Sequence, residues 1–440
     1  MSKAFVSPRR RASGVLLHLT SLPKPGLGPD ASRFARFLQD AGQSWWQMLP
    51  VNPTLPGGSP YDAYSAFAGD PRLLGVSVRA PARGELARFL KANAHWLDDF
   101  ALFVALKRAW GGASWRRWPR GLRLHEAAAL CDARVRYQSS IDAIVRAQWA
   151  FAYKWAQFKR DCNQRGIRLI GDIPFYVAYE SADVWANQRF FMLGRDGKAE
   201  AVSGVPPDYF SAKGQMWGNP LYRWTALKRE AYPWWTQRLR RALSMFDALR
   251  LDHFIGFERY WSVPAGARDA RGGRFVKGPG AGFFRALSRD LGPATLIAED
   301  LGILTARVHA LRERFGLPGM KVLQFEIAER AALMPGALPS LPVDCFAYTG
   351  THDNDTIASW LSSRGAGGLT HWDAIEALYR SEARNVIIPL QDILGLHSDA
   401  RMNTPGTTKG NWRWKFAWRA IKPSLARRLQ MLGRVNRRCR

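Results

Sequence analysis

Acidic residues recur at the ends of four strand-like segments of this chain. The segments are residues 169–172, 249–253, 297–300 and 350–354. In a parallel β/α barrel the ends of the strands meet at one face, and active sites are built there. Two carboxyl groups at such a face can cleave and re-form a glycosidic bond, because one protonates the leaving oxygen while the other meets the oxocarbenium-like carbon. The pattern therefore predicts chemistry on glycosidic bonds.

Asp252 and Glu299 are the pair that we expect to do this chemistry. Counted along the chain, Asp252 ends the fourth strand and Glu299 ends the fifth, so the two are neighbours. In a retaining mechanism the two carboxyl groups lie about 5–5.5 Å apart, which neighbouring strand ends can supply. Asp353 ends the seventh strand and is expected to face the pair across the mouth of the barrel, with Asp172 at the end of the third.

The residues around this pair predict different protonation states. Arg250 lies two residues before Asp252, on the same side of a strand, and its charge would keep that carboxylate ionised, as a nucleophile requires. Apolar residues 296–298 precede Glu299. Burial there would raise the pKa of the Glu299 carboxyl toward the range of a general acid.

Each of these residues is weak evidence alone, because an Asp at a strand end more often caps a helix or solvates a loop. The combination in barrel order is what favours catalysis. His253 and His352 stand beside two of the acids and are expected to donate hydrogen bonds to sugar hydroxyls.

Strand-like and helix-like segments alternate along the chain. The strand-like segments are residues 14–19, 45–51, 168–177, 248–254, 295–299, 320–325, 345–348 and 386–390. Amphipathic helices are expected over residues 31–41, 279–291, 305–315 and 371–384. Their alternation predicts an α/β fold, a single (β/α)8 TIM barrel over residues 1–440, with strands buried on both faces. A doubly wound sheet is the alternative, but no Gly-rich phosphate loop follows any strand.

Two stretches interrupt the alternation. Residues 70–160 are expected to be an inserted, mostly helical subdomain. Residues 178–232 are rich in Gly, Pro and aromatic residues and are expected to be an irregular, loop-rich insertion that carries a substrate lid. Aromatic rings in Gly- and Pro-rich loops are suited to stacking on glucose units, although most Trp and Tyr residues simply pack a core. These loop aromatics are Tyr61, Tyr64, Tyr209, Phe210 and Trp217.

The composition limits the class of protein. The formal net charge is +28 and the pI is about 10.6, which would suit a polyanion binder, but the basic residues are spread along the chain. We therefore favour a basic surface on an enzyme of neutral substrate, and nucleic acid is not the expected partner. The four cysteines have no metal-site spacing, so free thiols in the cytoplasm are expected. The sequence predicts no metal, no cofactor, no signal peptide and no membrane span.

The ordered motifs of the chain resemble the 4-α-glucanotransferases, the amylomaltase or disproportionating-enzyme family of the α-amylase clan. The resemblance covers nearly the whole chain. It is carried by residues 17–23, 59–61, 65–69, 171–174, 183–186, 204–210, 214–222, 250–253, 277–280, 298–302, 316–325, 350–356, 400–403, 405–406 and 410–412.

This resemblance implies a retaining transfer of α-1,4-glucan segments without a metal or cofactor. It implies Asp252 as the nucleophile, Glu299 as the acid/base and Asp353 as the acid that stabilises the transition state. It further implies a barrel without a C-terminal β-sandwich and a lid within residues 206–222. The residues expected to bind substrate are Ser59, Tyr61, Asp172, Asp208, Tyr209, Gln215, Trp217, Asn219, Arg250, His253, His352 and Asn354.

The chain departs from the family pattern at a few positions. Asp70 stands where Asn is usual, Ile255 where Arg is frequent, and Phe275 where Trp or Tyr is common. The stretch 72–96 is short, so the resemblance does not fix the contacts to distal sugars or the preferred glucan length.

Two other functions fit parts of the pattern. An α-glucan hydrolase of the same clan would use the same acids and is poorly separated from a transferase by the acids alone. An inactive barrel that binds polyanions would explain the charge, but it would have no need of the complete set of catalytic acids.

Overall fold

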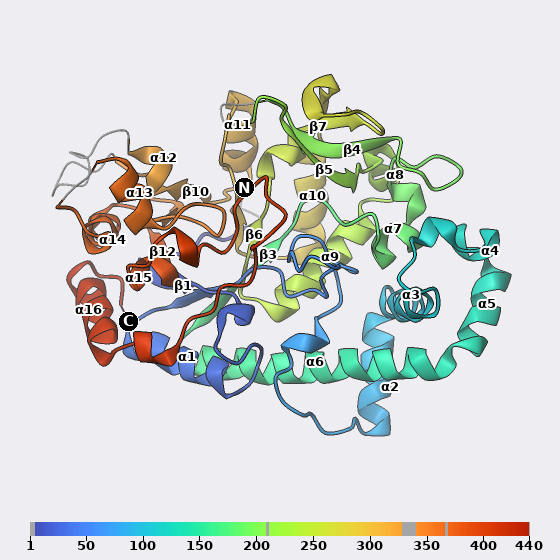
Figure 1. Ribbon diagram of the computed structural model, residues 1–440, viewed down its shortest axis with the longest axis horizontal. Helices are drawn as coiled ribbons and strands as arrows, with labels where there is room; N and C mark the ends of the chain where they lie inside the picture. The colour runs from blue at the N-terminus through green and yellow to red at the C-terminus, as the bar shows by residue number, and fades with distance from the viewer. Residues whose placement is uncertain (1–4, 208–210, 328–339, 366–367, 440) are drawn as a thin grey trace.

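The computed structural model describes residues 5–207, 211–327, 340–365 and 368–439. Eight parallel strands close into a barrel in the order β1-β12-β11-β10-β9-β6-β3-β2. Their bounds are Ala12–Leu16 (β1), Trp45–Gln47 (β2), Arg168–Ile173 (β3), Ala248–Leu251 (β6), Leu296–Ala298 (β9), Gly319–Val322 (β10), Cys345–Tyr348 (β11) and Asn385–Pro389 (β12). The predicted α/β barrel is confirmed, and all eight predicted segments contribute a strand (Figure 1).

Period-two alternation along each strand divides the core into two layers. One set of side chains fills the barrel interior and forms its own apolar cluster, which includes Ala12, Trp45, Ile170, Ala248, Ile297, Met320, Phe346 and Ile387. The alternate set, including Leu169, Leu249 and Leu296, packs outward against the helices. Positions that continue the interior set toward the strand ends, such as Asp172 and Arg250, therefore face the mouth of the barrel.

Helices cover the outside of the barrel (Figure 1). The four predicted ones are found as α1 (Pro29–Asp40), α10 (Gly280–Leu291), α11 (Ala306–Arg314) and α14 (His371–Arg380). Others are α9 (Pro233–Met245), α12 (Leu323–Glu326), α13 (Ile357–Ser363), α15 (Leu390–Ile393) and α16 (Pro423–Val435). The predicted strand 320–325 is too long, because the chain turns into α12 at Leu323.

Helices also make up most of residues 70–160. They are α2 (Arg83–Asn93), α3 (Leu97–Ala109), α4 (Arg120–Arg123), α5 (Ala127–Arg136) and α6 (Gln138–Gln164). Helix α6 is long enough to reach from this cluster back to the barrel, where it precedes β3 (Figure 1).

The expectation that residues 178–232 are irregular is wrong in part. Besides α7 (Ala182–Ala186) and α8 (Trp224–Arg229), this stretch contains β4 (Ala201–Val205) and β5 (Gln215–Pro220). They join β7 (Arg259–Pro264) and β8 (Arg274–Lys277) in a separate antiparallel sheet of order β5-β4-β7-β8. Because β7 and β8 come from a later part of the chain, local composition could not reveal this pairing. We keep the division into a barrel with two inserted subdomains as a proposal.

All four cysteines are free thiols. No helix among the described residues is both long and apolar enough to cross a membrane.

Candidate active site

Three adjacent barrel strands bring Asp172, Asp252 and Glu299 together. Strand β6 pairs with β9 in a register that places Leu251 opposite Ala298, so the next residues on the two strands, Asp252 and Glu299, are neighbours. The amide of Glu299 donates to the carbonyl of Leu251 across this junction, at 3.0 Å. On the other side of β6, β3 places Asp172 opposite Arg250. The predicted adjacency of the two acids is confirmed.

Arg250 lies between two carboxylates. Its Nη1 is 2.8 Å from Asp172 Oδ2 and 2.9 Å from Asp252 Oδ1. Arg250 and Asp172 are both buried, and burial raises the pKa of Asp172 against the lowering effect of Arg250. Tyr61 Oη donates to Asp172 Oδ2 at 2.6 Å and thus completes this ion-pair network. The contact between Arg250 and Asp252 that the strand alternation predicted is present.

Glu299 is held by backbone donors. The amides of His253 and Leu301 donate to its two carboxyl oxygens at 2.6 and 3.2 Å. Burial raises the pKa of Glu299 to about 8, with a further contribution from Asp252, while Arg250 and the two amides lower it. The predicted upward shift is therefore present, and it brings the pKa of Glu299 into the range that suits a general acid. His253 has a left-handed backbone (φ 48°), which is uncommon for a residue other than Gly and marks a constrained position beside Glu299.

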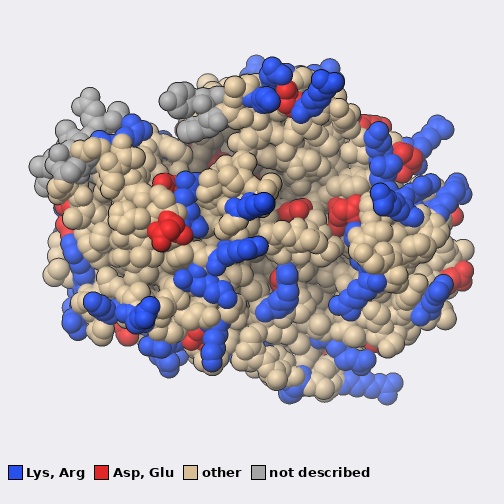
Figure 2. Space-filling view, in the orientation of Figure 1, with Lys and Arg blue, Asp and Glu red and all other residues tan. Residues whose placement is uncertain are grey.

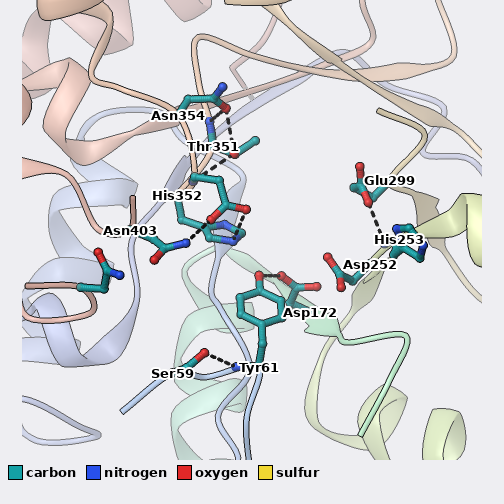
Figure 3. A network of polar contacts seen from close by, with 12 residues as sticks. Ser59, Tyr61, Asp172, Asp252, His253, Glu299, Thr351, His352, Asn354 and Asn403 are labelled. Carbon is teal, nitrogen blue, oxygen red and sulfur yellow. Dashed lines mark hydrogen bonds and ion pairs between the residues drawn. The ribbon is translucent and has the colours of Figure 1, made fainter. Parts of the chain in front are cut away.

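Asp353 is bound by His352 and Asn403, which Figure 3 shows on the opposite side of the mouth from Glu299. His352 Nε2 lies 3.3 Å from Asp353 Oδ2, and Asn403 donates to Oδ1 at 2.6 Å. Desolvation raises the pKa of Asp353, but His352, Asn403 and Arg250 outweigh it and hold that pKa well below its usual value. A neighbouring residue, Asn354, accepts from the backbone amide and the hydroxyl of Thr351 and so fixes the turn that carries Asp353.

Aromatic rings line the space between the acids. Tyr61 stacks on His352, with ring centroids 5.2 Å apart, and Trp412 lies 6.0 Å from Tyr61. On the other side, Trp217 packs edge-on against His253 at 5.1 Å and is 39% exposed. Aromatic rings therefore lie on two opposite walls of the mouth of the barrel.

The remaining predicted substrate-binding residues have different surroundings. Gln215 accepts from Trp217 Nε1 at 3.2 Å, so it supports that ring. Asn219 accepts from Ser203 and donates to the carbonyl of Val177, so both ends of its amide already have protein partners. Ser59 accepts from the amide of Tyr61 at 3.3 Å. The predictions for Asp208 and Tyr209 fall outside the described residues.

The sequence reasoning missed several residues that touch this site. Asn403 binds Asp353 directly, and Arg401 Nη2 donates to the carbonyl of Asp353 at 2.9 Å. His18, from the loop after β1, is buried beside His352, and burial lowers its pKa to about 3, so it stays neutral. The segments 17–23 and 400–403 belong to the motifs that carry the family resemblance, but nothing in their local pattern relates them to Asp353.

No group of His, Cys, Asp or Glu side chains among the described residues is arranged to hold a metal ion.

Comparison with known proteins gives a consistent result. The sequence matches the family described as 4-alpha-glucanotransferase, glycoside hydrolase family 77, over residues 17–83 and 76–420. The chain is 40% identical to a 4-alpha-glucanotransferase of Thermus thermophilus, over 97% of this chain and 99% of that protein. It is 39% identical to one of Synechocystis, over 92% and 94% of the two chains. The alignment with the Thermus protein is 496 positions long, more than the 440 residues here, so that protein carries segments this chain lacks.

A solved structure agrees with these sequence matches. The amylomaltase of Streptococcus agalactiae, in complex with acarbose, superposes with a TM-score of 0.91 at 29% identity, covering 98% of this chain and 100% of that one. With its closed barrel and the acids at its mouth, this chain belongs to glycoside hydrolase family 77 and is a 4-alpha-glucanotransferase.

Proposed function

We propose that this chain transfers α-1,4-glucan segments by a retaining, two-step mechanism in which Asp252 is the nucleophile, Glu299 the acid/base and Asp353 the transition-state stabiliser. The observation that carries the proposal is the contrast between the two neighbouring acids. Asp252 is paired with Arg250 at 2.9 Å, whereas the pKa of Glu299 is raised to about 8. One carboxyl group can attack while its neighbour donates a proton only if their environments give the two groups different pKa values.

In the first step, Asp252 attacks C1 of a glucose unit and the bond from C1 to the leaving oxygen breaks. Glu299 gives its proton to that oxygen, so the reducing-end fragment departs as an alcohol. The glucan remains bound to Asp252 as an ester, and Glu299 is left as a carboxylate. The backbone amides of His253 and Leu301 then stabilise that carboxylate, since each donates to one of its oxygens.

In the second step, Glu299 takes the proton from the 4-hydroxyl of an acceptor glucan or glucose. The acceptor oxygen attacks C1, the ester to Asp252 breaks, and both acids return to their starting states. The configuration at C1 is inverted twice and is therefore retained.

Asp353 supports both steps as a fixed negative charge. It stands across the mouth from the reacting pair, and its low pKa keeps it ionised while positive charge develops on the sugar ring. Tyr61 and His352 offer a stacked platform for that sugar, and Arg250 holds Asp172 and Asp252 in place.

Transfer rather than hydrolysis requires that an acceptor sugar displace water from the site. Trp217, on the exposed strand β5, is placed beside His253 to cover a bound sugar, and we propose that residues 206–222 act as the lid.

The four free thiols support the further proposal of a cytoplasmic enzyme. We propose maltooligosaccharides, amylose or glycogen-derived chains as its substrates, and nucleic acid is not expected as a partner.

Incubation with maltotriose tests the proposal. We expect glucose together with a ladder of longer maltooligosaccharides and a constant total of reducing ends. Glucose and maltose alone, with a matching rise in reducing ends, would identify an α-glucan hydrolase instead.

A further inference from the structure

A run of exposed basic residues follows the active-site segment 400–403. It consists of Lys409, Arg413, Lys415, Arg419 and Lys422, all exposed, and we call it the basic ridge. Exposure alternates along residues 413–419, so that the basic side chains face solvent while the residues between them are partly or fully covered. Residues 413–417 have no regular secondary structure and Arg419 lies in the short 3-10 helix Trp418–Ala420, so the charged side chains share one short exposed stretch of chain.

Aromatic residues anchor the ridge from beneath. Phe416 is buried against Phe34 of α1, with ring centroids 6.1 Å apart. Trp418 donates through Nε1 to Asp30 at 2.9 Å, and the guanidinium of Arg33 covers its ring at 4.1 Å. The backbone of the ridge is thus fixed to the barrel, while its charged ends remain available.

The charges of the ridge are not neutralised by the protein. Among the described residues, none of its five members takes part in an ion pair or donates a side-chain hydrogen bond to a protein group. The sequence has no Asp or Glu after Asp399. Asp30, the acid that contacts this segment through Trp418, also accepts from the amide of Lys24 at 2.8 Å.

The ridge continues directly from the glucan site. Trp412, one residue before Arg413, lies with its ring centroid 5.9 Å from His352 and 6.0 Å from Tyr61. Its amide donates to the carbonyl of Met402 at 2.7 Å, next to the Asn403 that binds Asp353. Figure 2 shows Lys and Arg side chains crossing the middle of one face, along the path of the red C-terminal segment in Figure 1, with the surface hollowed beside them.

The unpaired charges of the basic ridge would not help to bind a neutral glucan, because an electrostatic field attracts only charged ligands. Single-stranded nucleic acid binds where charged grooves are combined with free aromatic faces for base stacking. Here Phe416 is buried and Arg33 covers Trp418, so those faces are occupied. The geometry instead favours a sugar polymer that enters the active site and carries scattered anionic groups.

We propose that the basic ridge binds phosphate monoesters carried by α-glucan chains, so that phosphorylated α-glucans are a preferred substrate class of this enzyme. This inference rests on the proposed function, since it assumes that a glucan occupies the neighbouring site. A phosphate monoester carries nearly two negative charges at neutral pH. Arg and Lys bind it through short, charge-assisted hydrogen bonds.

The decisive variant neutralises three ridge residues: Arg413→Gln, Lys415→Gln and Arg419→Gln together. Its matched control neutralises three exposed residues of α2, Arg83→Gln, Arg88→Gln and Lys91→Gln, and so changes the net charge by the same amount. Both sets lie outside the catalytic machinery.

The experiment compares kcat/KM for phosphorylated maltooligosaccharides with kcat/KM for the same chains after phosphatase treatment. For the unaltered enzyme at low salt we expect a ratio of roughly ten in favour of the phosphorylated chains, falling toward one in 0.5 M NaCl. The ridge variant should lose the preference at low salt, and the α2 variant should keep it. A ratio near one in the unaltered enzyme, or an unchanged ratio in the ridge variant, overturns the proposal.

Binding separates this inference from the catalytic one. The unaltered enzyme should migrate more slowly in a native gel that contains phosphorylated amylopectin than in one that contains the dephosphorylated polymer. The ridge variant should show no such difference between the two gels, whether or not transfer occurs. Absence of transfer on maltotriose would count against the proposed function alone. A gel shift with single-stranded oligonucleotide that depends on the ridge, without any difference between the two glucans, would assign the surface to nucleic acid and refute the proposal.

Discussion

Two buried arginines lie at opposite ends of the barrel and are stabilised in different ways. At the mouth, Arg250 binds two carboxylates, Asp172 and Asp252. At the base, Arg438 is fully buried and, within the described part of the chain, donates only to backbone carbonyls, among them those of Tyr379 and Ser381 at 2.9 Å. Arg250 thus binds carboxylates, whose charge can change during a reaction. Arg438 binds backbone carbonyls, whose dipoles are fixed.

At the base, the buried Arg438 is stabilised by backbone groups and has a structural role. The carbonyls around Arg438 belong to the end of α14 and to the entry into β12, and carbonyls at a helix end carry partial negative charge. Arg11 also donates to those of Tyr379 and Ser381. Burial lowers the pKa of Arg438 to about 9, and the neighbouring positive charge of Arg11 lowers it further. At the mouth, by contrast, several acids compete for one arginine, and the unfavourable proximity of Asp252 helps to keep Glu299 protonated.

This comparison predicts that activity and stability can be separated by substitution at the two ends. The largest effect is expected for Asp252→Asn, which removes the nucleophile while keeping the shape of the side chain. Transfer from maltotriose should fall by more than about 10⁴-fold. Calorimetry with maltoheptaose should still detect glucan binding, and the melting temperature should stay within a few degrees of the unaltered enzyme. Activity above one per cent would refute the role of Asp252.

Glu299→Gln is expected to have the next largest effect, about 10³-fold on natural glucans, because the variant has no proton to give to the leaving oxygen. An α-glucosyl fluoride donor needs no such proton, so release of fluoride should be reduced much less. The two donors therefore report separately on the acid role and on general damage to the site. Equal losses with both donors would contradict the assignment of Glu299 as the acid.

At the base, Arg438→Ala should destabilise the fold by about 3 kcal/mol, because loss of a fully buried side chain leaves a cavity and takes one donor from several carbonyls. Arg11 still donates to the carbonyls of Tyr379 and Ser381 in this variant. The neighbouring Arg437 is exposed, and Arg437→Ala should therefore change the free energy of unfolding by less than about 0.5 kcal/mol. Urea denaturation measures both, and kcat on maltotriose should be normal in both at temperatures where they remain folded. A loss of kcat in folded Arg438→Ala would break the separation between the two ends.

The contrast between the ends also explains how much could be predicted from the sequence. The strands were visible because burial on both faces demands near-continuous apolar runs, and their order then placed Asp252 beside Glu299 without any structure. Arg250 was found because it lies two residues from Asp252 on one strand. These are short-range patterns, and such patterns can be read from a single segment of sequence.

What the sequence reasoning missed depends on contacts between distant segments. Asn403 reaches Asp353 across 50 positions, and Arg438 reaches Tyr379 across 59. The sheet made by β4 with β7 is of the same kind, since its strands are separated by α8, α9 and β6. An Asn in a Pro- and Gly-rich loop, or an Arg in an Arg-rich tail, has no local feature that marks it as buried or bonded.

The smallest effect is expected for Asn403→Ala, which tests whether the contacts of Asp353 set its pKa independently of the pKa of Glu299. Asn403 donates to Asp353 and lowers its pKa, so Asn403→Ala should raise that pKa and move the acid limb of the kcat/KM profile to higher pH. The basic limb should stay near pH 8, because activity there is lost when Glu299 gives up its proton, and Asn403 does not touch Glu299. We expect a loss of about tenfold in kcat. A shift of both limbs would mean that Asn403 shapes the whole site, whereas a shift of the acid limb alone would show that the acids on the two sides of the mouth are set independently.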